Sequence, residues 1–166
     1  MEWGLKLMKL IDIVDYDIIN YKKPSMFLIF PNCTFKCGRA ECQNFALSKE
    51  KAIDVMPYEV TTRYLDSPLT EAVVCGGLEP FDSWEELQAF IRDFRYYTPD
   101  DIVIYTGYEE EEIKDKIEWL SLFENIIIKF GRYRTNEPSH YDNLLGVSLM
   151  SSNQYAKAYN VMEGYC

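Results

Sequence analysis

The sequence has no uninterrupted apolar run of about 18 residues, which a membrane-spanning helix requires. Its first residues, MEWGLKLMKL, lack both the apolar segment and the small-residue cleavage site of a secretory signal. We therefore expect a cytoplasmic protein with no membrane partner. In that compartment cysteine thiols stay reduced, so structural disulfides are disfavoured.

Positive charge is also scarce. The chain has 17 lysine and arginine residues against 27 aspartate and glutamate residues, and its formal net charge is −10. Proteins that bind nucleic acids usually carry a basic surface, because they must neutralise backbone phosphates. We therefore expect no nucleic-acid partner.

No internal repeat, low-complexity tract or Gly/Ser linker divides the chain. At 166 residues, with 48% hydrophobic and 27% charged residues, its composition is that of a globular protein. A chain of this size buries about 68–70% of its unfolded surface and needs no cross-links to fold. The sequence therefore predicts a single domain spanning residues 1–166.

Apolar runs of strand length alternate with segments of helical periodicity. The predicted strands are Ser25–Phe30, Glu71–Gly77, Asp101–Gly107, Asn125–Gly131 and Leu144–Met150, and the predicted helices are Pro57–Leu65, Ser83–Phe94 and Glu109–Phe123. Ser83 and Glu86 have the spacing of a helix capping box. The alternation predicts right-handed β-α-β units, and therefore an α/β fold. It is either a small doubly wound open parallel sheet or an incomplete (β/α) barrel.

Residues able to do chemistry follow three of these predicted strands. Three cysteines follow the first strand, Gly76 and Gly77 end the second, and Thr106 and Gly107 end the third. In both kinds of fold, ligands bind beyond the carboxyl ends of the parallel strands. The sequence therefore predicts a ligand site at this edge of the sheet.

The cysteines Cys33, Cys37 and Cys42 lie within the segment PNCTFKCGRAECQN, with the spacing C-x3-C-x4-C. Three thiolates on one loop can hold one face of a metal centre. A structural zinc ion would need a fourth ligand, whereas an iron–sulfur cube with three protein ligands keeps one iron open for a substrate. Thiols without a metal are the third alternative, and the residues alone leave all three open.

The remaining candidate ligands are Cys75, Cys166 and the single histidine, His140. We expect Cys75 to be a core thiol, because it lies in an apolar strand, and His140 to be a loop residue that binds no metal. The tail EGYC is too short to assign a role to Cys166.

Five motifs, in order, resemble those of the radical S-adenosylmethionine superfamily, and most closely the activating proteins of anaerobic, glycyl-radical ribonucleotide reductases. The motifs are VDYDIINYKKPSMFLIFPNC, CTFKC with CQN, GGLEP, IYTGY and SSNQ, and they span Ile11 to Gln154. Three differences accompany the resemblance. The cluster loop has two extra residues before Cys42, Leu78 interrupts the Gly-Gly-Glu-Pro motif, and Phe130 stands where the family commonly has aspartate.

The resemblance implies a 4Fe–4S cluster held by Cys33, Cys37 and Cys42, which are then both the metal ligands and the catalytic residues. The open iron would bind S-adenosylmethionine, and one electron would cleave it to methionine and a 5′-deoxyadenosyl radical. The implied cofactor contacts are Phe35, Gly76, Gly77, Glu79, Thr106, Gly107 and Asn153, with Gln154 on the adenosyl or partner side.

The implied activity is that of an oxidoreductase that installs a glycyl radical on a larger partner enzyme. Flavodoxin or ferredoxin would then supply the electron. Two alternatives stay open. One is radical modification of a peptide or small molecule, and the other is a zinc-stabilised α/β binding module without catalysis.

Overall fold

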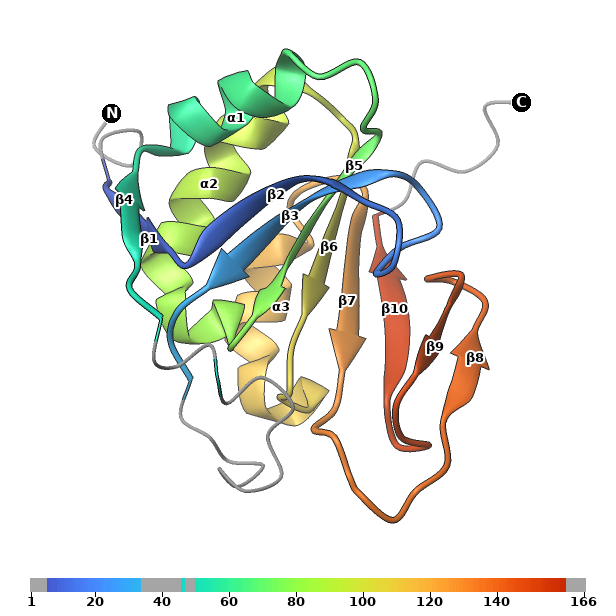
Figure 1. The fold of residues 1–166 in the computed structure, drawn as a ribbon. Helices are drawn as coiled ribbons and strands as arrows, with labels where there is room; N and C mark the ends of the chain where they lie inside the picture. The colour runs from blue at the N-terminus through green and yellow to red at the C-terminus, as the bar shows by residue number, and fades with distance from the viewer. Residues whose placement is uncertain (1–5, 34–45, 47–49, 161–166) are drawn as a thin grey trace.

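The computed structural model describes residues 6–33, 46 and 50–160 (Figure 1). Along this part of the chain the strands are β1 (Met8–Leu10), β2 (Asp12–Asp17), β3 (Ser25–Phe30), β4 (Ile53–Val55), β5 (Ala72–Gly77), β6 (Asp101–Tyr105), β7 (Ile126–Phe130), β8 (His140–Asp142), β9 (Val147–Leu149) and β10 (Tyr155–Tyr159). The helices are α1 (Pro57–Leu65), α2 (Trp84–Tyr97) and α3 (Lys114–Leu120), with short 3-10 turns η3 (Pro80–Ser83) and η4 (Glu110–Ile113) before the last two.

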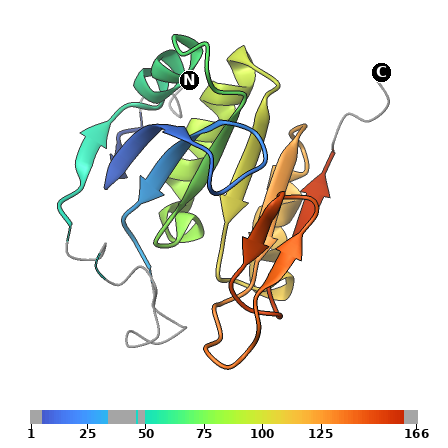
Figure 2. The ribbon, with the colours of Figure 1, turned by 45° about the vertical axis from the view of Figure 1, so that its right-hand side comes forward.

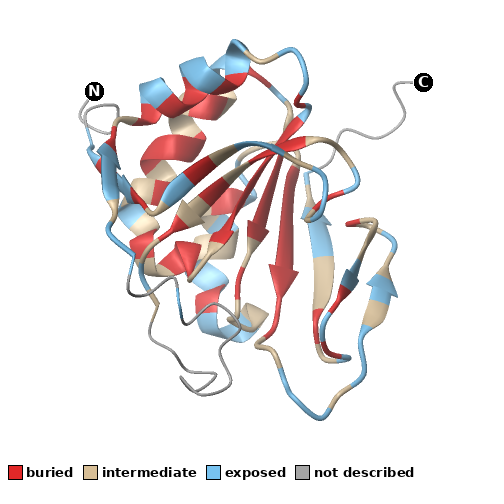
Figure 3. Cartoon of the chain, viewed as in Figure 1, coloured by how far each residue is buried: buried red, intermediate tan, exposed pale blue. Residues whose placement is uncertain are grey.

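The central sheet has the strand order β10-β7-β6-β5-β3-β2. The four inner strands β3, β5, β6 and β7 are parallel, whereas β2 and β10 pair antiparallel at the two edges. The fold is therefore mixed α/β with a mostly parallel central sheet, as predicted. The inner strands are apolar runs because both of their faces are covered, and Figure 3 shows β5, β6 and β7 as almost continuously buried.

All three helices pack on one face of this sheet (Figures 1 and 2). The parallel strands follow one another in chain order, so the order never reverses. The helices share one apolar core with alternate strand residues such as Leu28, Cys75, Ile104 and Ile128. A doubly wound sheet needs a reversal that sends helices to both faces. Of the two predicted alternatives, the doubly wound sheet is therefore wrong, since the described sheet is wound in one direction. The incomplete (β/α) barrel stays a prediction.

The other face of the sheet has a smaller core. Val74 and Val103 of the sheet pack there against Tyr21 from the β2–β3 connection and against Leu145 and Leu149 from the β8–β9 hairpin. The hairpin is a separate two-stranded sheet that stands in front of β7 and β10 in Figure 2. Val147 and Leu149 of the hairpin also line a cavity together with residues at the carboxyl ends of the parallel strands.

The chain departs from the predicted elements near its C-terminal end. The predicted last strand, Leu144–Met150, is reduced to β9 of the hairpin, and β10 follows it to close the edge of the central sheet. The predicted helix Glu109–Phe123 divides into η4 and α3. There the carboxylate of Glu112 accepts a hydrogen bond from the Glu109 backbone nitrogen, at 2.9 Å, and caps the 3-10 turn.

The predicted capping box at the start of α2 is wrong. The Ser83 hydroxyl makes no cap hydrogen bond and accepts one from the Asn32 side chain, at 2.9 Å. The Glu86 carboxylate accepts from the Lys9 backbone nitrogen, at 3.0 Å. Both side chains thus bond distant segments of the chain and not the helix end. The spacing of Ser83 and Glu86 in the sequence cannot indicate such long-range contacts.

Among the described residues, none of the helices has the length and apolar character to cross a bilayer.

Candidate functional site

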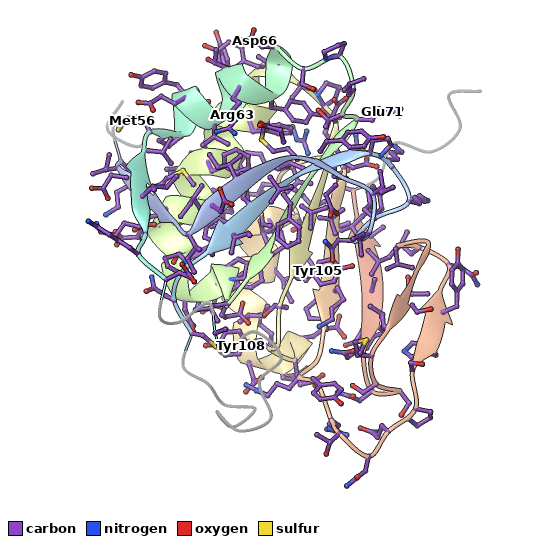
Figure 4. All side chains as sticks on the ribbon, viewed as in Figure 1. Met56, Arg63, Asp66, Glu71, Tyr105 and Tyr108 are labelled. Carbon is purple, nitrogen blue, oxygen red and sulfur yellow. The ribbon has the colours of Figure 1, made fainter. Side chains whose placement is uncertain are left out.

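The carboxyl ends of β3, β5, β6 and β7 surround a cavity of about 530 Å³. It opens on the sheet face that carries the β8–β9 hairpin. The lining residues include Cys33, Gly76, Gly77, Glu79, Tyr105, Thr106, Gly107, Lys129, Arg132, Leu149 and Gln154. Figure 4 shows Tyr105 in front of the sheet and Tyr108 further down, past the strand ends, whereas Arg63 and Asp66 of α1 lie at the opposite end of the molecule. The fold thus brings six predicted site residues, Cys33, Gly76, Gly77, Glu79, Thr106 and Gly107, to one cavity.

Cys33 lies three residues beyond the end of β3 and borders the cavity. The segment before it is fixed to the exit of β5: the Glu79 backbone nitrogen donates to the Asn32 carbonyl oxygen, at 2.7 Å, and the Leu78 nitrogen donates to the Phe30 oxygen, at 3.1 Å. The predicted residues Phe35, Cys37 and Cys42 lie outside the described residues. The position of the first cysteine is therefore set by main-chain bonds between two neighbouring strand ends.

Glu79 is the most buried acidic side chain of the site, with 5% of its surface exposed. Its Oε2 accepts from the Phe81 backbone nitrogen at 3.1 Å, and its Oε1 accepts from the Gly107 nitrogen at 2.8 Å. The Thr106 hydroxyl lies 2.9 Å from both carboxylate oxygens and donates to this carboxylate. One carboxylate therefore connects the loops after β5 and β6.

Burial raises the pKa of Glu79 to about 7, although hydrogen bonds from Gly107, Phe81 and Thr106 oppose the shift by favouring the ionised form. The effect of desolvation on the pKa is larger than that of the hydrogen bonds, because the carboxylate is almost fully buried. The sequence predicts Glu79 as a cofactor contact, and the structure adds that its oxygens already hold neighbouring loops.

The two glycines at the end of β5 have different surroundings. A Cβ on Gly77 would lie 2.6 Å from Ile29 Cγ2, and the residue has a φ of +90° that disfavours other residues. A Cβ on Gly76 would lie 3.1 Å from the ring of Phe27. Both glycines border the cavity. Close packing against β3 is therefore a reason for glycine at Gly77, beside the predicted contact with a ligand.

Lys129 is a cavity residue that the sequence prediction did not include. It lies on β7 with 7% of its surface exposed, and its ammonium donates to the carbonyl oxygens of Thr106 (3.3 Å) and Gly131 (2.9 Å). Burial lowers its pKa to about 8, while the charges of Glu79 and Glu109 oppose the shift. A lysine inside the apolar run IIIKF is the sequence signal for it, because lysine is almost never fully buried without a partner.

The SSNQ motif forms a turn between β9 and β10 that holds the loop after β7. Asn153 donates to the Arg132 carbonyl oxygen at 2.8 Å, and its Oδ1 accepts from the Ser151 hydroxyl at 2.6 Å. Gln154 borders the cavity and donates to the Gly131 oxygen at 3.2 Å. The structure thus gives both amides bonds within the protein, and the cofactor contact of Asn153 stays a prediction.

Two other predicted residues lie away from the cavity wall. Cys75 is fully buried in the core on the helix side of the sheet, so the prediction of a core thiol is confirmed, and burial raises its pKa. His140 lies in strand β8, not in a loop as predicted, and its Nε2 contacts the Gln154 carbonyl oxygen at 2.8 Å. Within residues 6–33, 46 and 50–160, three or more His, Cys, Asp or Glu side chains are nowhere grouped to hold a metal ion.

Comparison with known families matches residues 24–155 to the family described as "4Fe-4S single cluster domain". The match covers far more than half of the chain, from the residue before β3 to the first residue of β10. It includes the three clustered cysteines and every lining residue from β3 to Gln154. No curated protein and no solved structure matches the chain.

Proposed function

The chain belongs to the 4Fe–4S single cluster domain family, and from that membership we propose that it is a radical S-adenosylmethionine enzyme. The observation that carries the proposal is the position of Cys33 on the wall of the same cavity as Gly76, Gly77, Thr106 and Gly107. The predicted cluster ligand Cys33 and the predicted cofactor contacts thus line one cavity, although they follow or end three different strands.

The donor set fits an iron–sulfur cluster better than a structural zinc site. Cys33, Cys37 and Cys42 would supply three thiolates from one short segment, whereas a structural zinc ion needs four ligands, and the family match is to a 4Fe–4S domain. Three thiolates leave one iron of a 4Fe–4S cluster open for substrate. When bound, the reduced cluster supplies the electron that cleaves S-adenosylmethionine into methionine and a 5′-deoxyadenosyl radical.

The cavity has the size and chemistry for a charged cofactor with an apolar part. Its volume lies within the range of about 300–1,000 Å³ of small-molecule sites. Lys129 offers a buried ammonium for a carboxylate group, and Gly76 and Gly77 border the same cavity without side chains that would keep a ligand away. Phe27 and Ile29 line the apolar part and exclude water from a reactive species.

We propose that the substrate is a glycine in a larger glycyl-radical enzyme, with flavodoxin or ferredoxin as the electron donor. Two apolar residues support a protein substrate: Ile19 and Met150 line the cavity and are largely exposed. Exposed apolar side chains at the edge of a cavity are typical of protein interaction sites. The family resemblance of the five motifs supports the choice of partner.

The test is anaerobic reconstitution of the full chain with iron and sulfide, followed by reduction, addition of S-adenosylmethionine and assay of 5′-deoxyadenosine. We expect product from the wild type and from Cys75→Ala, whose thiol lies on the helix side of the sheet, and none from Cys33→Ala, Cys37→Ala or Cys42→Ala. A glycyl-radical enzyme added to the same mixture should then give an electron paramagnetic resonance signal on its glycine.

Stoichiometric zinc with no cluster after reconstitution would overturn the proposal in favour of a binding module. An intact cluster without any 5′-deoxyadenosine, even with a glycyl-radical enzyme present, would exclude radical chemistry. Cleavage without a glycyl radical on the added enzyme would reject that partner and favour a peptide or small-molecule substrate.

A further inference from the structure

One backbone carbonyl, that of Gly131, accepts hydrogen bonds from two buried side chains. Lys129 Nζ donates to it at 2.9 Å and Gln154 Nε2 donates to it at 3.2 Å. The two donors come from different elements, β7 and the turn before β10. The carbonyl is therefore a point of contact between the cavity lysine and the SSNQ turn.

Gln154 is itself held rigidly. Only 6% of its surface is exposed, and its Oε1 accepts from the backbone nitrogens of Met150 and Ser151, both at 3.1 Å. Its carboxamide thus uses the oxygen to fix the turn and the nitrogen to hold Gly131. Because the side chain has bonds at both ends, it transmits the position of the turn to the carbonyl.

The backbone at Gly131 fits this arrangement. Its φ is +104°, and a Cβ there would lie 3.2 Å from Asn153 Nδ2 and 3.4 Å from Gln154 Cα. Its nitrogen donates to the Tyr108 oxygen, at 3.1 Å, so the peptide groups on both sides of Gly131 are held by hydrogen bonds. A residue with a side chain would be strained and crowded here, which explains glycine at this position.

The consequence concerns the direction of the Lys129 ammonium. An ammonium group has three donors, and among the described residues Lys129 donates to two carbonyl oxygens, those of Thr106 and Gly131. Its Nζ also lies 5.7 Å from the centroid of the Tyr105 ring. In this part of the chain the ammonium has no third hydrogen-bond acceptor, so one donor can serve a ligand in the cavity that Lys129 lines. A buried cation whose protein partners are neutral carbonyls suits an anionic ligand group.

We propose that Gln154 is a positioning residue, which holds the Gly131 carbonyl so that the Lys129 ammonium is directed into the cavity. Its effect on cofactor binding rests on the proposed function, whereas its effect on Lys129 does not. Gln154 acts through Lys129 and need not touch the ligand.

The test is NMR of the full chain carrying 13C-labelled lysine, with the Lys129 signal assigned by its loss in Lys129→Met. Gln154→Met keeps the volume of the side chain but removes its hydrogen bonds. We expect it to move the Lys129 titration midpoint by about one pH unit toward the ordinary lysine value, because a displaced carbonyl lets water reach the ammonium. Glu79 and Glu109, whose charges act on Lys129, are unchanged in this variant.

Ser152→Ala is the matched control, because Ser152 lies in the same turn but bonds the Glu137 carboxylate, at 2.9 Å. An unchanged Lys129 midpoint in a folded Gln154→Met protein would overturn the proposal, as would an equal shift in Ser152→Ala. If Gln154→Met does not fold, Gln154→Asn takes its place with the same two outcomes, because its shorter amide cannot reach both the turn and Gly131. The lysine signal needs no S-adenosylmethionine cleavage, so failure here is distinguishable from failure of the proposed activity.

Discussion

The Thr106 hydroxyl lies 2.9 Å from each carboxylate oxygen of Glu79, so the threonine that directly follows β6 is bonded to a glutamate that follows β5. The Gly107 nitrogen adds a bond of 2.8 Å to the same carboxylate. The loops that border the cavity are thus held by a buried acidic group. This group is ionisable, so the stability of the site depends on pH.

Glu79→Gln is expected to lower the free energy of unfolding by about 1–3 kcal/mol near pH 4.5, because an amide offers one oxygen where the carboxyl offers two. One of the two backbone nitrogens, that of Phe81 or Gly107, would then face an NH₂ group. Urea unfolding of both proteins measures the difference. Ser152→Ala, a change on the exposed turn, serves as the control and should leave stability unchanged.

The same pair of proteins gives a pH dependence with a defined sign. The pKa of Glu79 is about 7 in the folded chain against 4.5 in the unfolded chain, so the folded state binds more protons between these values. The wild-type stability contribution therefore falls as pH rises from 4.5 to 7, by up to about 3 kcal/mol. Glu79→Gln lacks this decrease, so the two stability curves should converge toward pH 7. Parallel curves would contradict the burial argument.

Gly77→Ala is expected to destabilise the fold by more than about 1 kcal/mol, because the new Cβ meets Ile29 Cγ2 at 2.6 Å in a backbone with a φ of +90°. Gly107→Ala is the matched control, since the nearest atom to its Cβ is the flexible Arg132 Cγ at 3.3 Å. Thermal unfolding of both variants checks this. Equal loss in the two variants would mean that strain at Gly77 is not the cause.

Much of the sheet could be predicted from the sequence, because strands that are buried on both faces consist of continuous apolar runs. For this reason the four parallel strands lie close to their predicted bounds, and helix α1 also has its predicted bounds. The edge strand β10 was missed because its sequence, YAKAY, is short and half polar, and it forms only against Phe130 and the residues before it. The sequence could not decide between a doubly wound sheet and winding in one direction, as in an incomplete barrel, because apolar runs do not indicate which face of the sheet a helix covers.

The site was predictable where motifs mark it and not where the fold assembles it. Cys33, Gly76 and Thr106 were predicted because they end or follow predicted strands, and all three line the cavity. The bonds of Glu79 to Thr106 and Gly107 could not be predicted, because they join residues 27 and 28 positions apart and depend on the register of β5 and β6. Lys129 could have been noticed in the sequence as a lysine within an apolar strand. That it lines the cavity is known only from the structure.

Cys42→Ala should abolish cluster assembly if the longer loop before Cys42 still brings this thiol to the cluster. Iron analysis and visible absorbance of the reconstituted protein measure this, with about four irons per chain expected for the wild type. Cys75→Ala is the control and should keep its iron, because Cys75 is fully buried on the helix side of the sheet. A Cys42→Ala protein that retains four irons would exclude Cys42 as a ligand.

Lys129→Met should separate stability from binding. Replacing a buried cation by an apolar side chain of similar length is neutral or stabilising in many proteins, so we expect no loss of stability at pH 7. The variant should bind S-adenosylmethionine about 10- to 100-fold more weakly, because a charge-assisted hydrogen bond contributes about 1.5–3 kcal/mol. Equilibrium binding to the reconstituted protein under anaerobic conditions measures the change.

Alkaline pH gives this prediction a second measurement. The pKa of Lys129 is about 8 in the folded chain against 10.5 in the unfolded chain, so the unfolded state binds more protons between these values. This lysine therefore makes wild-type stability rise with pH from about 8 to 10.5, by up to about 3 kcal/mol, and Lys129→Met lacks that rise. Lys157→Met is the control, because Lys157 lies exposed on the adjacent strand β10 and pairs with Glu110. Equal affinity for S-adenosylmethionine in Lys129→Met and Lys157→Met would show that the cavity ammonium does not bind the cofactor.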